Sequence, residues 1–316
     1  NDQRFGAIFI SVVDRRLVAR AIDMSYRVLA EKSIEPDAGA GNDEMARSLR
    51  ELVEVMAADF PVGIEIGTVV LSLSGLLDIP GKIWCVSSRW PQLRNLTIAE
   101  VFRGMAWPLV LVRNLDAELA GIRLQEKHAD SESALLLHWG FGIGAAFSAD
   151  GSVINRNRGR FCEIGHWTLG NAKGRPCTCG NQDCLETVAA GWALGPSLRA
   201  DHPDLPLDEA HLAEQLRQLD LLDFPSMREA LAQVLRVTAN LCRLLFPDRL
   251  ILTGPFVQNP DVFHQFVETV ATAPLVKSLD KVRISVSEVG QNFEIIGALD
   301  GPFATTLMDY LASSTT

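Results

Sequence analysis

Long hydrophobic runs are absent from this sequence. The apolar stretch at residues 105–112 is far shorter than the roughly 20 residues that a bilayer-spanning helix needs, and it contains Pro108. The first residues, beginning at Asn1, also lack the basic segment and the apolar segment that are typical of a secretory signal. We therefore expect a soluble, cytoplasmic protein with no membrane partner.

Basic residues are scarce relative to acidic ones. The chain has 29 Lys and Arg against 39 Asp and Glu, which gives a net charge of −10. A surface of that charge repels the phosphates of nucleic acids, so general binding of DNA or RNA by this body is excluded. The composition, 47% hydrophobic and 22% charged over 316 residues, is that of one large or two medium globular domains.

Alternating strand and helix patterns occur twice along the chain. Residues 44–60 have apolar residues three and four positions apart, and 64–73 is a nearly continuous apolar run typical of a central strand. Thr97 followed by Glu100 predicts a capping box. The expected strands are 5–13, 17–23, 26–31, 64–73, 109–112, 134–139, 143–149, 153–154, 249–252 and 282–288. The expected helices are 44–60, 97–106, 185–194, 208–219, 226–245, 262–273 and 295–311. This order predicts two related α/β halves around a cleft.

The cysteines are unevenly distributed. Cys177, Cys179 and Cys184 lie within eight residues, and His166 precedes them. Thiolates and imidazole are ligands that tetrahedral Zn²⁺ prefers, and this set leaves no position for a reactive water. The pattern favours a structural Zn²⁺ site; the alternative is free thiols beside an unrelated histidine. Three further cysteines are expected to be small core residues: Cys85, Cys162 and Cys242.

Two segments around these cysteines resemble a known signature. Glu163-Ile164-Gly165-His166, followed by Cys177-Thr178-Cys179-Gly180-Asn181-Gln182-Asp183-Cys184-Leu185-Glu186, closely resembles the signature of the ROK family of repressors, open reading frames and kinases. Three further segments match the family in order and spacing: 73–78, 240–254 and Gly297-Ala298. On these motifs the chain is identified as a member of the ROK family, closest to its NagC/XylR-like branch of sugar-responsive transcriptional regulators.

The resemblance implies an actin-like ATPase (ribonuclease H-like) fold, in which two α/β lobes surround a sugar-binding cleft. We assign residues 1–113 plus 297–316 to the N-terminal lobe and 114–296 to the C-terminal lobe, with a zinc loop at 163–186. Matched by position, the residues that contact the sugar are Ser74, Gly75, Asn114, Glu163, His166 and Glu186.

Chemistry supports these assignments in part. Carboxylates accept hydrogen bonds from sugar hydroxyls, and a metal on one nitrogen of His166 would orient the other nitrogen toward the sugar. For Glu186 a simpler role is open, because a carboxylate is also favoured in the first turn of a helix that starts near Leu185.

The position of the catalytic base differs from that of family kinases. Phosphoryl transfer needs a carboxylate to take the proton of the sugar hydroxyl. Kinases of the family have Asn-Asp after the strand, whereas this chain has Asn114-Leu115. Asp116 is one position along, which on a helix rotates the side chain by about 100°. Asp116 could act as the catalytic base only if the turn were shifted. Its alternative role is that of a carboxylate at the end of a helix.

The phosphate-binding loops differ as well. Where family kinases carry Asp-x-Gly-x-Thr after the first strand, this chain has the β-branched Val12 and Val13. In the glycine-rich segment 140–144, Phe141 stands where family kinases have a Thr. The alternative is that this segment is only a tight hairpin and not a phosphate loop. Pro255, in place of the second glycine of a Gly-Gly pair, removes an amide donor.

These differences predict no kinase activity. We expect the effector-binding and oligomerisation body of a ROK-type transcriptional regulator that senses a sugar or sugar derivative, as a homodimer or tetramer. We expect operator DNA to be bound only through a helix-turn-helix segment. That segment either lies upstream of Asn1 or has been removed. Two alternatives remain open: an ATP-dependent sugar kinase that uses Asp116 as a displaced base, and a stand-alone sugar-binding pseudokinase.

Overall fold

The chain divides into two compact units in a computed structural model that describes residues 4–126, 132–170, 174–206, 208–272, 282–288 and 290–314. The first unit comprises Asn1–Glu126, Asn155–Arg160 and Asn292–Thr316. The second unit comprises Lys127–Ile154 and Phe161–Gln291.

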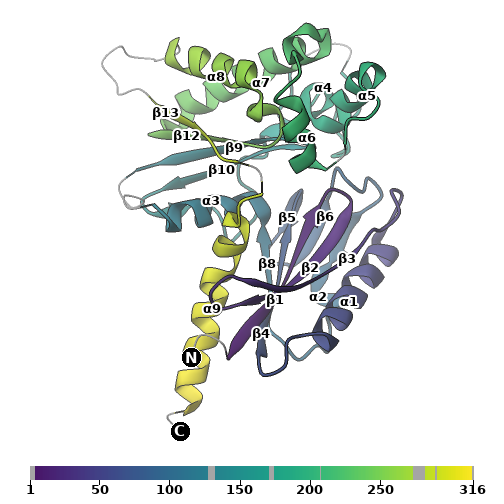
Figure 1. The fold of residues 1–316 in the computed structure, drawn as a ribbon, viewed down its shortest axis with the longest axis vertical. Helices are drawn as coiled ribbons and strands as arrows, with labels where there is room; N and C mark the ends of the chain where they lie inside the picture. Colours follow the sequence, from purple (N-terminus) through teal and green to yellow (C-terminus); the bar gives the residue numbers. More distant parts are fainter. Residues whose placement is uncertain are drawn as a thin grey trace. The chain divides into compact units, whose positions relative to one another are not determined.

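The first unit is built on a five-stranded mixed sheet (Figure 1). Its strand order is β3-β2-β1-β4-β8, with β1 parallel to β4 and β4 parallel to β8. These strands are β1 (Phe5–Val13), β2 (Arg16–Asp23), β3 (Val28–Ile34), β4 (Glu65–Leu73) and β8 (Leu109–Arg113). A second, three-stranded sheet consists of β5 (Leu76–Asp78), β6 (Ile83–Val86) and β7 (Arg94–Thr97). The helices are α1 (Asn42–Ala58), α2 (Ile98–Val101), α3 (Asn114–Leu124) and α9 (Phe293–Ser314).

Strand β1 is apolar throughout because both faces of the sheet are covered. Ile8 and Ile10 belong to the same core cluster as the buried face of α1. Ala7 and Phe9 point to the opposite face, where they pack with residues of α3 and α9. Alternation along the strand thus divides its side chains between two cores, as the two-residue period of a strand requires.

Helices α3 and α9 cross with almost no space between their backbones. An ideal Cβ on Gly121 would lie 1.9 Å from the carbonyl oxygen of Phe293, and one on Gly297 would lie 2.0 Å from that of Ala117. Glycine at these two positions therefore permits the close crossing, and any side chain would separate the helices.

The second unit contains another five-stranded sheet, of order β11-β10-β9-β12-β13. The strands are β9 (Ala134–Trp139), β10 (Ile143–Ala149), β11 (Ser152–Val153), β12 (Arg249–Thr253) and β13 (Arg283–Val286). Its α-helices are α4 (Glu186–Ala189), α5 (Gly191–Asp201), α6 (Glu209–Leu216), α7 (Pro225–Leu245) and α8 (Pro260–Thr272). The described part of this unit also has three short 3-10 helices: η2 (Ile164–His166), η3 (Leu221–Asp223) and η4 (Phe256–Gln258). One apolar core joins the sheet to α4, α5, α7 and α8.

Most of the expected elements are confirmed, and two are wrong. The helix expected at 97–106 ends after Val101, with Phe102 as its C-cap, and Gly104, with a φ of +85°, lies beyond its end. The Thr97 side chain makes no capping hydrogen bond. The single helix expected at 185–194 is interrupted at Ala190, whose ψ of 153° is extended. The expected end of a third helix, Ala273, lies outside the described residues. Strands β5, β6 and β7 were not expected.

The boundaries of the units differ from those of the expected lobes. Residues 114–126, assigned from the sequence to the C-terminal lobe, belong to the first unit because α3 packs on α9. Asn155–Arg160 also belongs to the first unit. In this segment the Arg158 carbonyl accepts a hydrogen bond from the Ile79 N–H, and Arg160 pairs with Asp78 at 2.8 Å.

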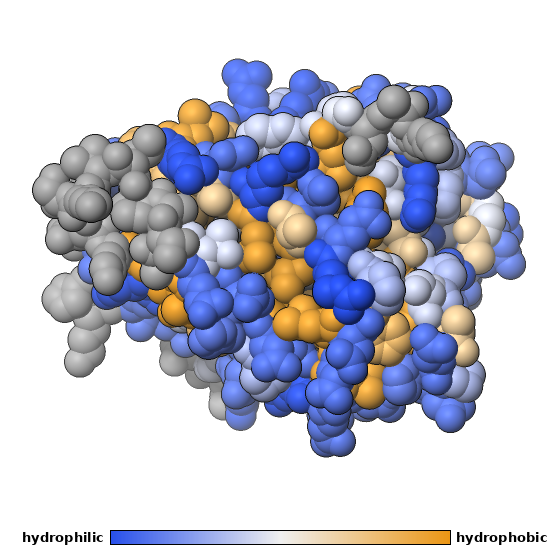
Figure 2. Space-filling view, turned by 90° about the horizontal axis from the view of Figure 1, so that it is seen from above, coloured by the Kyte–Doolittle hydropathy of each residue, from blue (hydrophilic) through white to orange (hydrophobic). Residues whose placement is uncertain are grey.

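Polar residues dominate the surface shown in Figure 2, where apolar side chains form narrow patches between hydrophilic ones. Among the described helices, none is both long enough and apolar enough to cross a bilayer.

The helix crossing leads to a testable prediction. Gly121→Ala places a methyl group against backbone that cannot yield, so we expect it to destabilise the protein by about 3 kcal/mol or more. Urea unfolding followed by circular dichroism measures this loss. Gly301→Ala is the matched control on α9, because a Cβ there meets no atom within 4 Å; it should be neutral or stabilising by up to about 1 kcal/mol. Equal effects of the two substitutions would contradict the close crossing.

Candidate functional site

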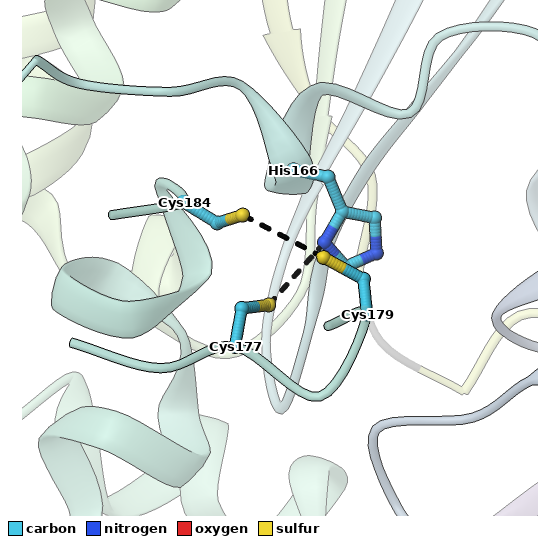
Figure 3. A group of neighbouring side chains, drawn as sticks. All are labelled: His166, Cys177, Cys179 and Cys184. Atoms are coloured by element: carbon cyan, nitrogen blue, oxygen red, sulfur yellow. Dashed lines mark hydrogen bonds between the residues drawn. The ribbon is translucent and has the colours of Figure 1, made fainter. Parts of the chain in front are cut away.

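Four potential metal ligands converge in the second unit (Figure 3). His166 is the last residue of η2, and Cys177, Cys179 and Cys184 come from the loop that precedes α4. One ligand atom from each residue lies within 4.8 Å of all the others. Gly180, with a φ of +94°, turns the chain between the second and third cysteines. The sequence prediction that these four residues come together is confirmed.

The distances fit a tetrahedral ion. A zinc ion bound tetrahedrally at about 2.3 Å from sulfur and about 2.0 Å from nitrogen separates two sulfurs by about 3.8 Å and a sulfur from a nitrogen by about 3.5 Å. Here Cys179 Sγ lies 3.7 Å from Cys184 Sγ, and Cys177 Sγ lies 3.5 Å from His166 Nδ1. With Nδ1 facing the thiols, the Nε2 atom of His166 is on the other side of the ring (Figure 3).

The electrostatics of the cluster call for a cation. Burial raises the pKa of the Cys177 thiol, and burial together with the neighbouring thiols raises the pKa of Cys184. Neutral thiols are poor ligands, whereas a divalent ion at their centre stabilises the thiolate form by direct attraction. The donor set therefore fits a metal of the Zn²⁺ class in both geometry and charge.

Three of the predicted sugar-contacting residues lie together beside this cluster. The Glu163 carbonyl accepts a hydrogen bond from the His166 N–H at 3.1 Å. Gly165, between them, packs so closely on Glu186 that an ideal Cβ would lie 2.8 Å from its Cγ. Glu186 is buried: its Oε1 accepts from the Ile143 N–H at 3.0 Å, and the Trp192 indole N–H lies 3.4 Å from Oε2. These contacts give Glu186 a structural role in joining α4 to β10.

The other three predicted residues lie in the first unit. Ser74 and Gly75 follow β4, and Asn114 follows β8. Because Leu73 and Arg113 are partners in parallel strands, these residues lie at the same carboxyl edge of the sheet, where α/β proteins commonly bind ligands. Gly75 has a φ of +94°, and an ideal Cβ there would lie 2.1 Å from the Val86 carbonyl oxygen, so only glycine fits this turn.

Asp116 lies in the interior of the first unit. It is 1% exposed and forms an ion pair with Arg113 at 3.0 Å, and that arginine is 3% exposed. Arg156, half-buried in the 155–160 segment, bonds the Gly297 carbonyl and is attracted by Asp116 and Asp300. Burial lowers the pKa of Arg156, and the two carboxylates oppose that shift. Leu115 beside them is buried and apolar.

The three segments that stand in place of the family kinases' phosphate loops, and were expected to differ from them, have well-defined structures. Residues 14 and 15 form a two-residue turn between β1 and β2, and Val12 and Val13 belong to the strand. Residues 140–142 form a tight connection between β9 and β10, as the alternative interpretation suggested. Gly254 has a φ of +97° and approaches Trp139, while Pro255 caps η4.

Glu209 is a residue of interest that the sequence did not indicate. It is the first residue of α6, and its Oε1 accepts a hydrogen bond from the Phe141 N–H at 2.8 Å. Its Oε2 lies 3.4 Å from His138 Nε2. The sequence predicts a helix there, but a contact across 68 residues leaves no signal in a single sequence.

Two α/β units, each built on a five-stranded sheet, define a protein of the actin-like ATPase and sugar kinase fold. The model of the ROK family matches residues 15–300. The chain belongs to the ROK family.

Its relatives include both regulators and kinases. The DNA-binding transcriptional repressor Mlc of Escherichia coli (strain K12) is 22% identical over 209 residues, covering 63% of this chain and 51% of Mlc. A glucokinase of Halalkalibacterium halodurans is 39% identical over 87 residues, 27% of this chain and 26% of the glucokinase. The chain thus matches about half or less of the length of these relatives. A solved ROK family transcriptional regulator, homologous to the E. coli Mlc protein, superposes with a TM-score of 0.72 at 18% identity, over 97% of this chain and 80% of the other.

The buried ion pair leads to a testable prediction. Asp116→Ala removes the carboxylate that pairs with the buried Arg113 guanidinium, and we expect a loss of about 3–5 kcal/mol in the free energy of unfolding. Replacing both residues, as Arg113→Met with Asp116→Leu, should restore most of that loss. Urea denaturation of the wild type, Asp116→Ala and the double variant measures these changes in the free energy of unfolding. In the exposed pair Arg4–Glu65, Glu65→Ala should cost about 0.5 kcal/mol. An Asp116→Ala protein as stable as the wild type would show that the ion pair is not structural.

Proposed function

We propose that this chain is the effector-binding and oligomerisation body of a ROK-type transcriptional regulator, and that it senses a sugar or sugar derivative without phosphorylating it. Family membership is compatible with a regulator or a kinase, and the likeness to the repressor Mlc supports the regulator class. Operator DNA would be contacted through a helix-turn-helix outside these residues, in a homodimer or tetramer.

The observation that carries the proposal is the environment of Asp116. A catalytic base must reach the hydroxyl proton of the sugar. The acidic residue in the first turn of α3 is Asp116, and it is buried against Arg113. Leu115, which precedes it, has no group that accepts a proton. Both facts argue against phosphoryl transfer at the end of β8.

In this proposal six residues recognise the sugar: Ser74, Gly75, Asn114, Glu163, His166 and Glu186. Asn114 and the Ser74-Gly75 turn would supply neutral hydrogen-bonding groups at one sheet edge, and Glu163 would accept from one or two hydroxyls. His166, held by a metal through Nδ1, would present Nε2. Glu186 would act mainly by holding β10 and α4 together, because its oxygens already have donors.

A kinase is the second candidate function, since a glucokinase matches part of the chain at 39% identity. It would require Asp116 to leave its ion pair with Arg113 and turn toward the sugar. A sugar-binding pseudokinase that contacts a protein partner shares the same site and differs only in lacking a DNA-binding segment.

Sugar binding is tested by thermal unfolding with a panel of free hexoses, N-acetylhexosamines and their phosphates. A ligand at 100 times its Kd stabilises the folded state by about 2.7 kcal/mol, which raises the Tm by several degrees. We expect at least one sugar to do so, and Glu163→Ala to abolish the shift. Glu268→Ala, an exposed carboxylate on α8, is the control and should retain it. The absence of any stabilising sugar, or a shift that persists in Glu163→Ala, would contradict the proposal.

We also propose that the cluster of His166, Cys177, Cys179 and Cys184 holds a structural Zn²⁺. Elemental analysis of protein purified from zinc-supplemented medium should find about one zinc per chain, as a closed four-ligand site requires. Cys179→Ser should lose the ion and lower the Tm, because metal binding and folding of the loop are coupled. Cys242→Ser should keep the zinc, since burial raises the pKa of this thiol to about 11 and it is not one of the four clustered ligands. Zinc-free wild-type protein would refute the assignment.

A further inference from the structure

The turn that follows β4 is fastened by a tryptophan from the interior of the first unit. Trp84, on β6, is 0% exposed, and its indole N–H donates a hydrogen bond to the Ser74 carbonyl at 3.0 Å. Ser74 comes directly after Leu73, the last residue of β4, and Gly75 completes the turn before β5. A core side chain is thus bonded directly to the backbone of the Ser74-Gly75 turn.

Trp84 is itself held in place by the strand and by the core. On β5, Leu76 pairs with Val86 and Leu77 pairs with Trp84, so Cys85 is an extra residue between the two pairs. An extra residue of this kind bends its strand and changes the direction of the neighbouring side chains. The Trp84 ring then packs against Trp90, with ring centroids 5.9 Å apart and planes at 84°. The donor of the hydrogen bond is therefore rigid.

This hydrogen bond determines which way the Ser74–Gly75 peptide group faces. The peptide is trans, so its C=O and its N–H point in opposite directions. Because the Ser74 carbonyl points inward to Trp84, the Gly75 N–H points away from that tryptophan. Among the described residues, none accepts a hydrogen bond from this N–H. It is a donor that a ligand at this edge of the sheet can use.

The glycine alone does not fix this orientation. Glycine adopts positive and negative φ about equally well, so a turn at Gly75 permits the preceding peptide to face either way. A hydrogen bond to a buried, rigid donor removes this freedom before any ligand arrives. Groups that are already oriented bind a ligand more tightly, because less ordering accompanies binding.

Trp90 provides an internal comparison. It is also 0% exposed, but its Nε1 has no hydrogen-bond partner among the described residues. Two indoles of the same size therefore lie in one core, and only that of Trp84 bonds the turn. Shortening either ring removes a similar apolar volume, whereas only the change at Trp84 releases the Ser74 carbonyl.

We propose that Trp84 is a positioning residue for ligand binding: by holding the Ser74 carbonyl inside the first unit, it orients the Gly75 N–H as a donor to an oxygen of the sugar. This inference rests on the proposed function, because it gives the Ser74-Gly75 turn a part in sugar recognition. Trp84 acts through the backbone of the turn and does not touch the ligand.

The first test compares sugar affinity in Trp84→Phe and Trp90→Phe, by calorimetric titration with a sugar that raises the Tm of the wild type. Trp84→Phe should bind this sugar about tenfold more weakly, a change of about 1.4 kcal/mol and the order of one hydrogen bond. Trp90→Phe should stay within about twofold of the wild type. Both variants should lose Tm to a similar degree, so a purely structural role would not separate them.

The second test needs no sugar. Ser-Gly occurs once in the sequence, at residues 74 and 75. In protein made by cell-free synthesis with ¹³C-carbonyl serine and ¹⁵N-glycine, only this peptide joins the two labels and gives a carbonyl–amide NMR correlation. We expect the signal to shift or split in Trp84→Phe, because the carbonyl loses its donor and the peptide reorients. In Trp90→Phe it should stay at its wild-type position.

Three results would overturn the inference: equal sugar affinity in Trp84→Phe and the wild type, an equal loss in Trp84→Phe and Trp90→Phe, or an unchanged NMR signal in Trp84→Phe. If Trp84→Phe does not fold, Trp84→Met takes its place with the same expected results, since methionine fills irregular apolar space and has no donor. A wild type that binds no sugar contradicts the proposed function, and the NMR signal then decides alone whether Trp84 holds the turn.

Discussion

The convergence of His166 and three cysteines determines the shape of the segment on which the candidate ligand site depends. Between residues 161 and 185, the described chain has one three-residue 3-10 helix and two isolated bridges, Thr168–Cys184 and Pro176–Gln182. A segment with so few backbone ladders needs side-chain interactions to hold one conformation. Ile164 and Leu185 anchor its two ends in the core of the second unit, and four ligand atoms within 4.8 Å close its middle. Glu163 and Glu186 take their positions from this loop.

Two acidic residues have their carboxylates paired inside the protein. Asp116 balances Arg113 within the first unit, and Glu209 occupies the loop between β9 and β10 in the second. Burying a charge is unfavourable unless a partner of opposite charge or good hydrogen-bond donors lie beside it. Each of these carboxylates is therefore stable in its buried position only while its partner is present. These contacts are the physical basis for our proposal that the chain binds a ligand, and shifts the population of its conformations, without turning the ligand over.

Much of this could be predicted from the sequence, for identifiable reasons. The α1 pattern and the apolar run of β4 have clear periods, and the metal cluster needed only three cysteines close in sequence. The helix expected at 185–194 failed because Ala190 is extended where Gly191 bonds the β9–β10 loop, a tertiary contact without a local signal. The same holds for Glu209, whose partner Phe141 is 68 residues away, and for Arg156, whose partners lie on α3 and α9. Contacts of this kind depend on packing, not on periodicity.

The most direct test of the central claim is an assay for phosphoryl transfer with purified protein, ATP, Mg²⁺ and a panel of hexoses and N-acetylhexosamines. Kinases turn over about 1–100 times per second, so even a weak activity is measurable by mass spectrometry of the sugar. We predict that sugar phosphate forms no faster with the protein than without it, including with any sugar that raises the Tm. Formation of sugar phosphate in proportion to protein concentration, at a rate within the kinase range, would contradict the account.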